Sequence, residues 1–236
     1  MLTKTKPSVE ENETGFSRRK FLGKLGGVAG ITAIAVACQK SVDNSNVNGS
    51  AIENSTANGS YGTGDVAILN YAYLLEQLEA AFYIMVSDNF YSGATNWEQT
   101  RLKQIRDHEI AHREFFKTAL ASSAIGEFQF DFSAVDFSSR TSVLTTAQVF
   151  EDTGVGAYNG VAYRIQNPDY LVLAGKIVSV EARHAGYIRE LVMMNSFADR
   201  SVVDIAGLDV MKTPHDVLTA VKPFIKTNMD MKSFPM

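Results

Sequence analysis

The sequence carries the same pair of motifs twice, and this duplication limits the possible fold more than any other feature. Each copy reads Glu-x6-Tyr and then Glu-x-x-His, with the two glutamates 33 residues apart in the first copy and 30 in the second. On an α-helix, residues three apart project from one face. Two helices with Glu-x-x-His and two that give one Glu each can supply the ligands of a dinuclear metal site inside a four-helix bundle. The candidate ligands are Glu76, Glu109, His112, Glu151, Glu181 and His184.

The repetition is what gives the pattern its weight. A single Glu-x-x-His is usually a solvated helix face, but the chain has only four histidines and the two motifs use two of them. Glu79 is an alternative to Glu76 as the first ligand, because it would make the spacing 30 residues in both copies. Glu76 is preferred because Tyr83 follows it by seven residues, the same spacing as in the second copy.

The distribution of apolar side chains predicts four long helices and one short one. Residues 67–86 are almost entirely apolar, so the first helix should be buried, and its glutamates need a partner or a metal ion. Alternating aromatic residues at 128–132 favour a crossover along the bundle, with a short strand as the alternative. We therefore expect an all-α fold: an antiparallel four-helix bundle with a long crossover between helices two and three. The expected helices cover about 67–86, 96–121, 143–165 and 168–195, with a short C-terminal helix from Thr213-Pro214 to Pro223.

Three residues near the motifs allow more than one interpretation. His108 lies about 100° around the helix from Glu109, so we expect it at the surface or beside the site and expect its replacement to leave metal binding intact. Gly154 and Gly156 each cost about 1 kcal/mol within a helix. They could give space for close helix packing or for a small oxidant, or they could simply be tolerated.

The N-terminal 37 residues have the pattern of an export signal. Ser-Arg-Arg-Lys-Phe-Leu at 17–22 precedes an apolar run at 26–37 that is too short to span a bilayer. The paired arginines resemble a twin-arginine signal, and an ordinary secretory signal is the alternative. The only cysteine, Cys38, follows Ala-Val-Ala and resembles the lipidated cysteine of a lipoprotein, although an ordinary signal peptidase could cut the same bond. We expect an exported, periplasmic or cell-envelope lipoprotein whose partner is the membrane.

The rest of the chain divides into a linker and one domain. Residues 38–64 are rich in Asn, Ser and Gly and predict a flexible tether, and residues 65–236 are long enough for one domain with its own core. Without residues 1–37 the chain holds 16 basic and 23 acidic residues, a formal charge of −7. This mildly acidic charge argues against nucleic-acid binding. A single cysteine excludes an internal disulfide and a four-thiolate iron centre.

The order of the ligands, together with Leu75–Tyr83 and Val-Glu-Ala-Arg-His-Ala at 180–185, resembles the ferritin-like superfamily. Within it, the sequence is similar to the exported bacterial ferritin-like, desiccation-associated group. The resemblance implies that the six candidate residues bind two iron or manganese ions. It also implies that Tyr83 and Tyr158 are catalytic neighbours, as hydrogen-bond donors to carboxylates or as redox-active groups. The alternative for both tyrosines is a place in the core with a satisfied hydroxyl.

Three functions are consistent with this pattern. The first is a di-metal oxidoreductase, with oxidase, peroxidase or catalase activity, that reacts with dioxygen or peroxide in oxidative-stress defence of the envelope. The second is iron binding or storage, which a lipid anchor on a tether makes less favourable because storage needs a closed cage of subunits. The third is a structural envelope protein without redox turnover. The sequence leaves room for a homodimer and does not distinguish iron from manganese.

Overall fold

The computed structural model describes residues 61–228. The expected signal segment, Cys38 and most of the linker lie outside the described residues. Within 61–228 the regular structure is helical, and no strand forms there; only two isolated antiparallel bridges occur. The helices are α2 Gly64–Asp88, α3 Asn96–Leu120, α4 Arg140–Val161, α5 Pro168–Val192 and α6 Pro214–Val221, with 3₁₀ turns at Ala121–Ser123, Ala162–Arg164 and Lys222–Phe224.

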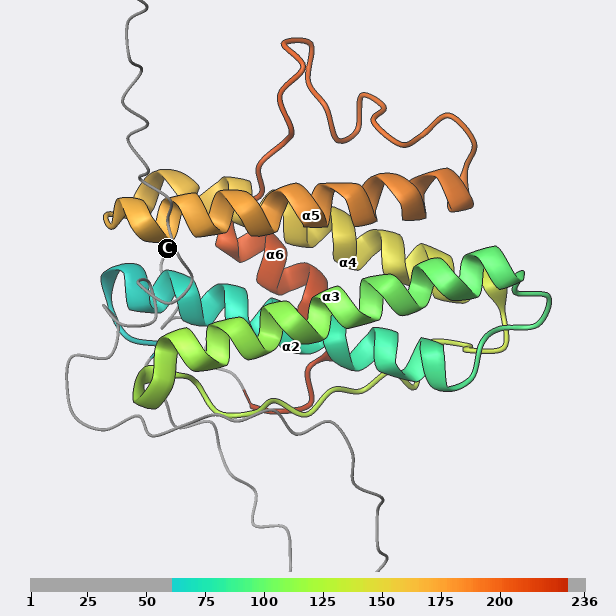
Figure 1. The fold of residues 1–236 in the computed structure, drawn as a ribbon, viewed down its shortest axis with the longest axis horizontal. Helices are drawn as coiled ribbons and strands as arrows, with labels where there is room; N and C mark the ends of the chain where they lie inside the picture. Colours follow the sequence, from blue (N-terminus) through green and yellow to red (C-terminus); the bar gives the residue numbers. More distant parts are fainter. Residues whose placement is uncertain (1–60, 229–236) are drawn as a thin grey trace, which may run out of the picture. The chain divides into compact units, whose positions relative to one another are not determined.

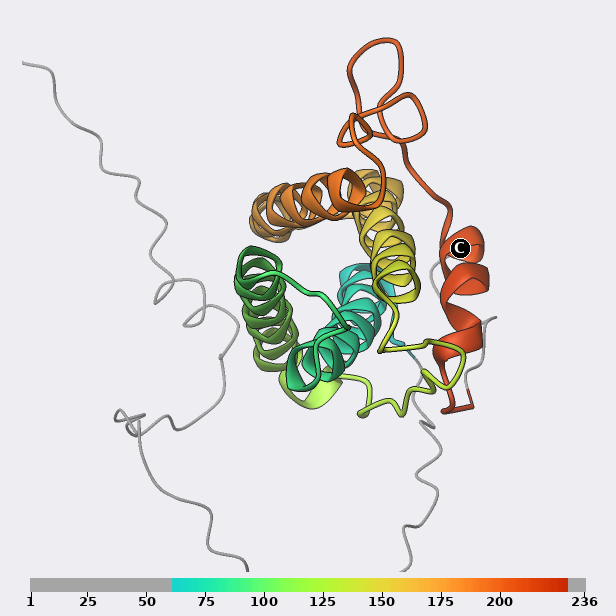
Figure 2. The ribbon, with the colours of Figure 1, turned by 90° about the vertical axis from the view of Figure 1, so that its right-hand side faces the viewer.

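The four long helices form a bundle, which Figure 2 shows end-on. Helices α2 and α3 form one antiparallel pair and α4 and α5 form the other, and a long connection runs along the bundle from the end of α3 to the start of α4 (Figure 1). Helix α6 packs against α4. The predicted all-α bundle with its crossover and short C-terminal helix is therefore confirmed.

The helices begin where the sequence provides caps. Thr95 and Glu98 form a reciprocal capping box at the start of α3, and Asn167 caps α5 by accepting a hydrogen bond from the backbone N–H of Asp169. At α6, Thr213 accepts a hydrogen bond from the backbone N–H of Asp216, and Pro214 occupies the first turn, as the sequence predicted.

Helix α2 is buried around most of its circumference, and two of its polar residues hold the crossover in place. The Asn70 amide donates to the Ser123 carbonyl at 2.8 Å, and its oxygen accepts from the Ile125 N–H at 2.8 Å. The Gln77 oxygen accepts from the Phe128 N–H at 2.9 Å. These buried amides satisfy backbone groups of the crossover, so two of the four buried polar or charged residues of α2 are structural.

Aromatic side chains attach the crossover to the bundle. Phe132 is buried against Phe82, Phe150 and Phe224, with ring centroids 5.7, 6.3 and 6.2 Å away. The expected alternative of a short strand is limited to one antiparallel bridge, between Phe130 and Ile225. The alternating aromatics therefore anchor a crossover rather than a strand.

Beyond α5, segment 193–213 projects from the bundle (Figure 1). Its base is fixed by Arg189, which is 4% exposed and donates to Asp152 at 2.6 Å, to the Ser196 carbonyl at 2.7 Å and to Ser201 at 2.7 Å. A buried guanidinium with this many partners ties the segment to α4 and α5. Of the helices described here, none combines the length and apolar character that a membrane span requires.

Candidate metal centre

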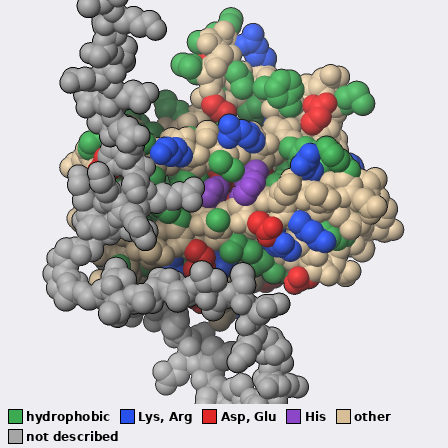
Figure 3. Space-filling model, in the orientation of Figure 1, with side chains coloured by type: hydrophobic (Ala, Val, Ile, Leu, Met, Phe, Trp, Pro, Cys, Tyr) green, Lys and Arg blue, Asp and Glu red, His purple; other side chains and the backbone are tan. Residues whose placement is uncertain are grey.

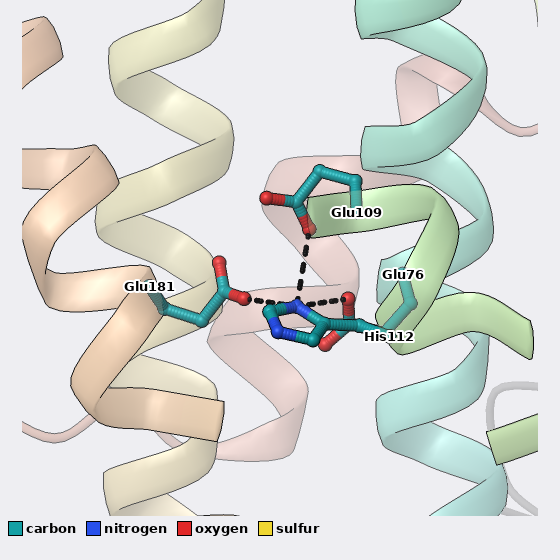
Figure 4. A group of neighbouring side chains, drawn as sticks. All are labelled: Glu76, Glu109, His112 and Glu181. Atoms are coloured by element: carbon teal, nitrogen blue, oxygen red, sulfur yellow. Dashed lines mark ion pairs between the residues drawn. The ribbon is translucent and has the colours of Figure 1, made fainter. Parts of the chain in front are cut away.

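The six candidate ligands come from all four bundle helices and lie together in the core. They form two overlapping groups, and within each group one ligand atom per residue lies within 4.8 Å of the others. Glu109 and Glu181 belong to both groups, so the two groups have two residues in common. Figure 4 shows the first group, with three carboxylates around one imidazole. The first group is Glu76, Glu109, His112 and Glu181, and the second is Glu109, Glu151, Glu181 and His184.

Each shared glutamate directs one oxygen toward each histidine. Oε1 of Glu181 lies 2.7 Å from Nδ1 of His112, and Oε2 lies 3.6 Å from Nδ1 of His184. Glu109 mirrors this arrangement, with Oε1 at 2.8 Å from Nδ1 of His184 and Oε2 at 3.7 Å from Nδ1 of His112. Each of these two carboxylates therefore offers one oxygen to the position beside His112 and the other to the position beside His184.

The other two glutamates are held from behind by tyrosines of the opposite half. Tyr83 of α2 donates to Oε1 of Glu151 on α4 at 2.5 Å, and Tyr158 of α4 donates to Oε1 of Glu76 on α2. In each case the other oxygen, Oε2, faces a histidine Nδ1: that of His112 at 3.4 Å for Glu76, and that of His184 at 3.7 Å for Glu151. The tyrosines thereby fix which carboxylate oxygen points into the centre. Burial raises the pKa of both phenols well above the usual value, so both stay protonated donors.

The buried atoms that face the centre fit a metal site. Eight of them, spread over all six residues, have no hydrogen-bond partner outside the centre and face only one another. Buried polar atoms in native proteins are nearly always satisfied, so buried oxygens and imidazole nitrogens that meet only one another fit a bound ion. The charges fit as well, because two divalent ions would balance the four carboxylates and leave both imidazoles neutral, which is their metal-binding form. The residues present are therefore suited to metal ions.

The pKa values show that protons compete for the same positions. Burial, reinforced by Glu181, raises the pKa of Glu76 to about 8, and burial raises that of Glu151 well above its usual value. Burial also opposes ionisation of Glu109, but the two histidines outweigh it and lower its pKa to about 2. Burial would lower the pKa of His184, but the surrounding carboxylates outweigh it and raise the pKa to about 11. Metal ions must displace these protons to bind.

Glu79 lies beside the centre but belongs to neither group. It is 3% exposed, and burial and the neighbouring ligand carboxylates raise its pKa well above the usual range. Its side chain occupies the space in front of Gly154, where an added Cβ would lie 2.9 Å from Oε1 of Glu79. The Cβ of an alanine at Gly156 would lie 2.8 Å from Cγ of Lys212. Both glycines therefore provide close packing, and the geometry favours Glu76 over Glu79 as the ligand.

His108 is exposed and lies outside both groups, as its position on the helix predicted. Its Nδ1 nevertheless lies 2.8 Å from Nε2 of His184, the ring nitrogen that faces away from the carboxylates. A ligating imidazole normally needs such a partner for its second nitrogen. A place beside the site was one of the two expectations for His108, but its partner His184 could not be predicted, because the contact joins α3 to α5 and depends on how the two helices are aligned.

Comparison with known proteins places these features in a family. A search of curated proteins gives no match. A family model described as a ferritin-like domain matches residues 64–194, which include all four bundle helices and all six residues of the centre. The match covers more than half of the chain, and the chain therefore belongs to the ferritin-like family.

Proposed function

We propose that this protein binds two iron or manganese ions and uses them to react with peroxide or dioxygen. The observation that carries the proposal is the sharing of Glu109 and Glu181 between the two groups, with one oxygen of each directed at each histidine. Two ions held by shared carboxylates act on one small molecule together. Mixed carboxylate and imidazole ligation suits iron and manganese, whereas sites for copper or structural zinc usually use more nitrogen or sulfur.

When bound, the two ions would supply a pair of electrons to the oxidant. Hydrogen peroxide that takes up two electrons and two protons gives two water molecules, and a second peroxide molecule or an external reductant returns the electrons. The protein contributes a buried environment in which the four ligand glutamates are 0% exposed. Tyr83 and Tyr158 keep Glu151 and Glu76 oriented, because their neutral hydroxyls donate to the outer carboxylate oxygens.

The centre comes nearest to the surface at the face between α3 and α5, and we infer that small molecules reach it there. Histidine side chains reach the surface on this face, as Figure 3 shows in the orientation of Figure 1. The side chain of His112 is 13% exposed and that of His184 is 6% exposed, whereas the glutamates beneath them are fully covered. This arrangement favours ions, peroxide and dioxygen over larger substrates.

The proposal is tested by loading the full chain with ferrous or manganous ions and measuring peroxide consumption and dioxygen uptake. We expect turnover that is lost in Glu109→Ala and Glu181→Ala and kept in His215→Ala, which removes an exposed histidine outside the centre. Uptake of many iron atoms per chain without turnover would favour storage. Absence of metal binding would favour a structural protein. Either result would contradict the proposed activity.

We also propose that the protein acts at the cell envelope, on the basis of its N-terminal sequence. The double variant Arg18→Lys, Arg19→Lys should not be exported if the export machinery recognises the twin-arginine motif. Normal envelope localisation of this variant would contradict that route. Mass spectrometry should find a mature chain that begins with diacylglycerol-modified Cys38. A different mature start, or an unmodified cysteine, would remove the lipid anchor from the proposal.

A further inference from the structure

We propose that His108 is a positioning residue for His184 and that it makes the two metal positions unequal in affinity. The inference rests on the proposed dinuclear centre and adds a property that the duplicated ligands alone would not give. The observation is the contact between Nδ1 of His108 and Nε2 of His184, at 2.8 Å.

The orientation of the two rings is that of a hydrogen bond. Their planes lie within 9° of each other, and their centroids are 5.1 Å apart. With two nitrogens only 2.8 Å apart, such a centroid distance requires the nitrogens to lie between the ring centres, so the rings meet edge to edge. The distance also falls within the usual range for a nitrogen donor and its acceptor.

The direction of the hydrogen bond follows from the position of the metal site. Nδ1 of His184 faces Glu109 at 2.8 Å and Glu181 at 3.6 Å, so this nitrogen must be unprotonated to bind an ion. The proton of the neutral His184 ring then sits on Nε2 and donates to Nδ1 of His108. His108 in turn carries its own proton on Nε2. The contact therefore fixes the metal-binding tautomer and the ring orientation of His184.

The other half of the centre has no corresponding group. His108 directly precedes the Glu-x-x-His motif of α3, and the residue directly before the motif of α5 is Val180. Each histidine lies near three of the glutamates, and these three contacts have the same pattern in both halves. Val180, which corresponds to His108, has an apolar side chain without a ring nitrogen. Within residues 61–228 the His112 ring makes no contact like that between His108 and His184. The difference between the two metal positions thus comes from the residue directly before each Glu-x-x-His motif, which is His108 in α3 and Val180 in α5.

The test compares variants of His108 by calorimetric titration of the full chain with manganous ions. Loss of the hydrogen-bond partner of a metal-binding side chain typically weakens metal binding by about 10- to 100-fold. We expect His108→Ala to weaken one of the two binding steps by that factor and to leave the other within about twofold. His108→Asn should restore most of the loss, because the Asn oxygen can accept the hydrogen bond from His184. His215→Ala is the matched control and should leave both steps unchanged.

Two further variants identify the affected ion. In a Glu76→Gln background, which removes a ligand beside His112, the remaining ion lies beside His184, and His108→Ala should weaken its binding. In a Glu151→Gln background the remaining ion lies beside His112, and the same change should have no effect. Equal losses in both backgrounds, no loss in either, or failure of Asn to restore binding would each overturn the inference.

A second readout requires no turnover. In protein loaded with zinc, nitrogen NMR should show His108 with its proton on Nε2 and His184 with its proton on Nε2. A proton on Nδ1 of His108 would overturn the inference, because that nitrogen could then not accept. The two proposals fail in different ways. If the unmodified protein binds no ion, the dinuclear centre is contradicted. If the unmodified protein binds two ions and His108→Ala binds them equally well, only the role of His108 is contradicted.

Discussion

The first half of the bundle, α2 and α3, and the second half, α4 and α5, are alike where they face the centre and differ just beside it. Both halves give two glutamates, one histidine and one tyrosine, and each tyrosine donates to a glutamate of the other half. Glu79, three residues after the first ligand of α2, corresponds to Gly154 in α4. His108, one residue before the motif of α3, corresponds to Val180 in α5.

These differences show at which positions the residue type can differ between the two halves without changing the centre. A shared carboxylate between two imidazoles needs the same residue types in both halves. The positions around it need only fit one another, and the large Glu79 side chain occupies the space in front of Gly154, where an added Cβ would lie 2.9 Å from Oε1 of Glu79 and force that side chain to shift. Two large side chains at these positions would collide where α2 and α4 approach. The centre is therefore symmetric in its ligands and asymmetric in its surroundings.

The largest effect should come from the two shared glutamates. Glu109→Ala and Glu181→Ala each remove a residue of both groups, so we expect neither variant to bind two ions stoichiometrically. Elemental analysis after loading and removal of excess metal measures the content per chain. If either variant retained two ions, the shared glutamate would not be a bridge, and the two halves would hold their ions independently.

A smaller loss should follow from replacing a glutamate that belongs to one group. Glu76→Gln and Glu151→Gln should each reduce the content by one ion, because each removes a charged ligand from one position only. Glu79→Gln should keep both ions, since it removes only a protonatable group beside the centre. Elemental analysis after loading distinguishes the variants that lose one ion from the variant that keeps both. A loss of one ion in Glu79→Gln but not in Glu76→Gln would reverse the assignment of the ligand.

The tyrosines should have equal and moderate effects. Tyr83→Phe and Tyr158→Phe keep the ring in the core and remove one hydrogen bond to a ligand glutamate. We expect each change to weaken metal binding by about tenfold, the lower end of the usual range for such partners. Titration calorimetry measures both. A large effect in one half with none in the other would show that the symmetric contacts are not energetically equivalent.

The smallest effect should be a dependence of stability on pH. The folded-state pKa of Glu76 is raised from 4.5 to about 8 and that of His184 from 6.5 to about 11. The folded, metal-free protein therefore binds more protons than the unfolded chain, and its stability should fall as pH rises from about 5 to about 9. Glu109, with its pKa lowered to about 2, acts in the opposite direction only at pH values below about 4.5.

Thermal melting in the presence of a chelator, at several pH values, measures this dependence. Bound ions replace the protons, and their affinity should increase with pH, so loaded protein should melt at a higher temperature than metal-free protein, with the difference widening as pH rises. A metal-free protein that became more stable between these pH values would contradict the raised pKa values.

The helices and the six residues of the centre could be predicted because they depend on local spacing. Apolar periodicity placed the four long helices, and the i, i+3 pairs placed Glu109 beside His112 and Glu181 beside His184. The choice between Glu76 and Glu79 needed more, because both are buried on α2 and their roles differ in what they meet: Glu76 faces His112, whereas Glu79 lies against Gly154. The buried Arg189 was also missed, with its three partners in segment 193–203 and Asp152 of α4, since they belong to no motif.

The contact of His108 illustrates the same limit. Its position on α3 correctly placed it outside the two groups, but that position alone could not identify its partner on α5. Residues 108 and 184 are 76 positions apart, and their separation depends on the relative rotation and register of two packed helices. Local spacing gives the direction of a side chain, and packing between helices decides what that side chain meets.

We propose that one bundle holds two ions through two shared glutamates. The decisive experiment is calorimetric titration of the metal-free full chain with manganous ions and, in the absence of oxygen, with ferrous ions. We predict saturation at two ions per chain and release of protons as the ions bind. Saturation at one ion, or no binding by the intact protein, would contradict the dinuclear centre.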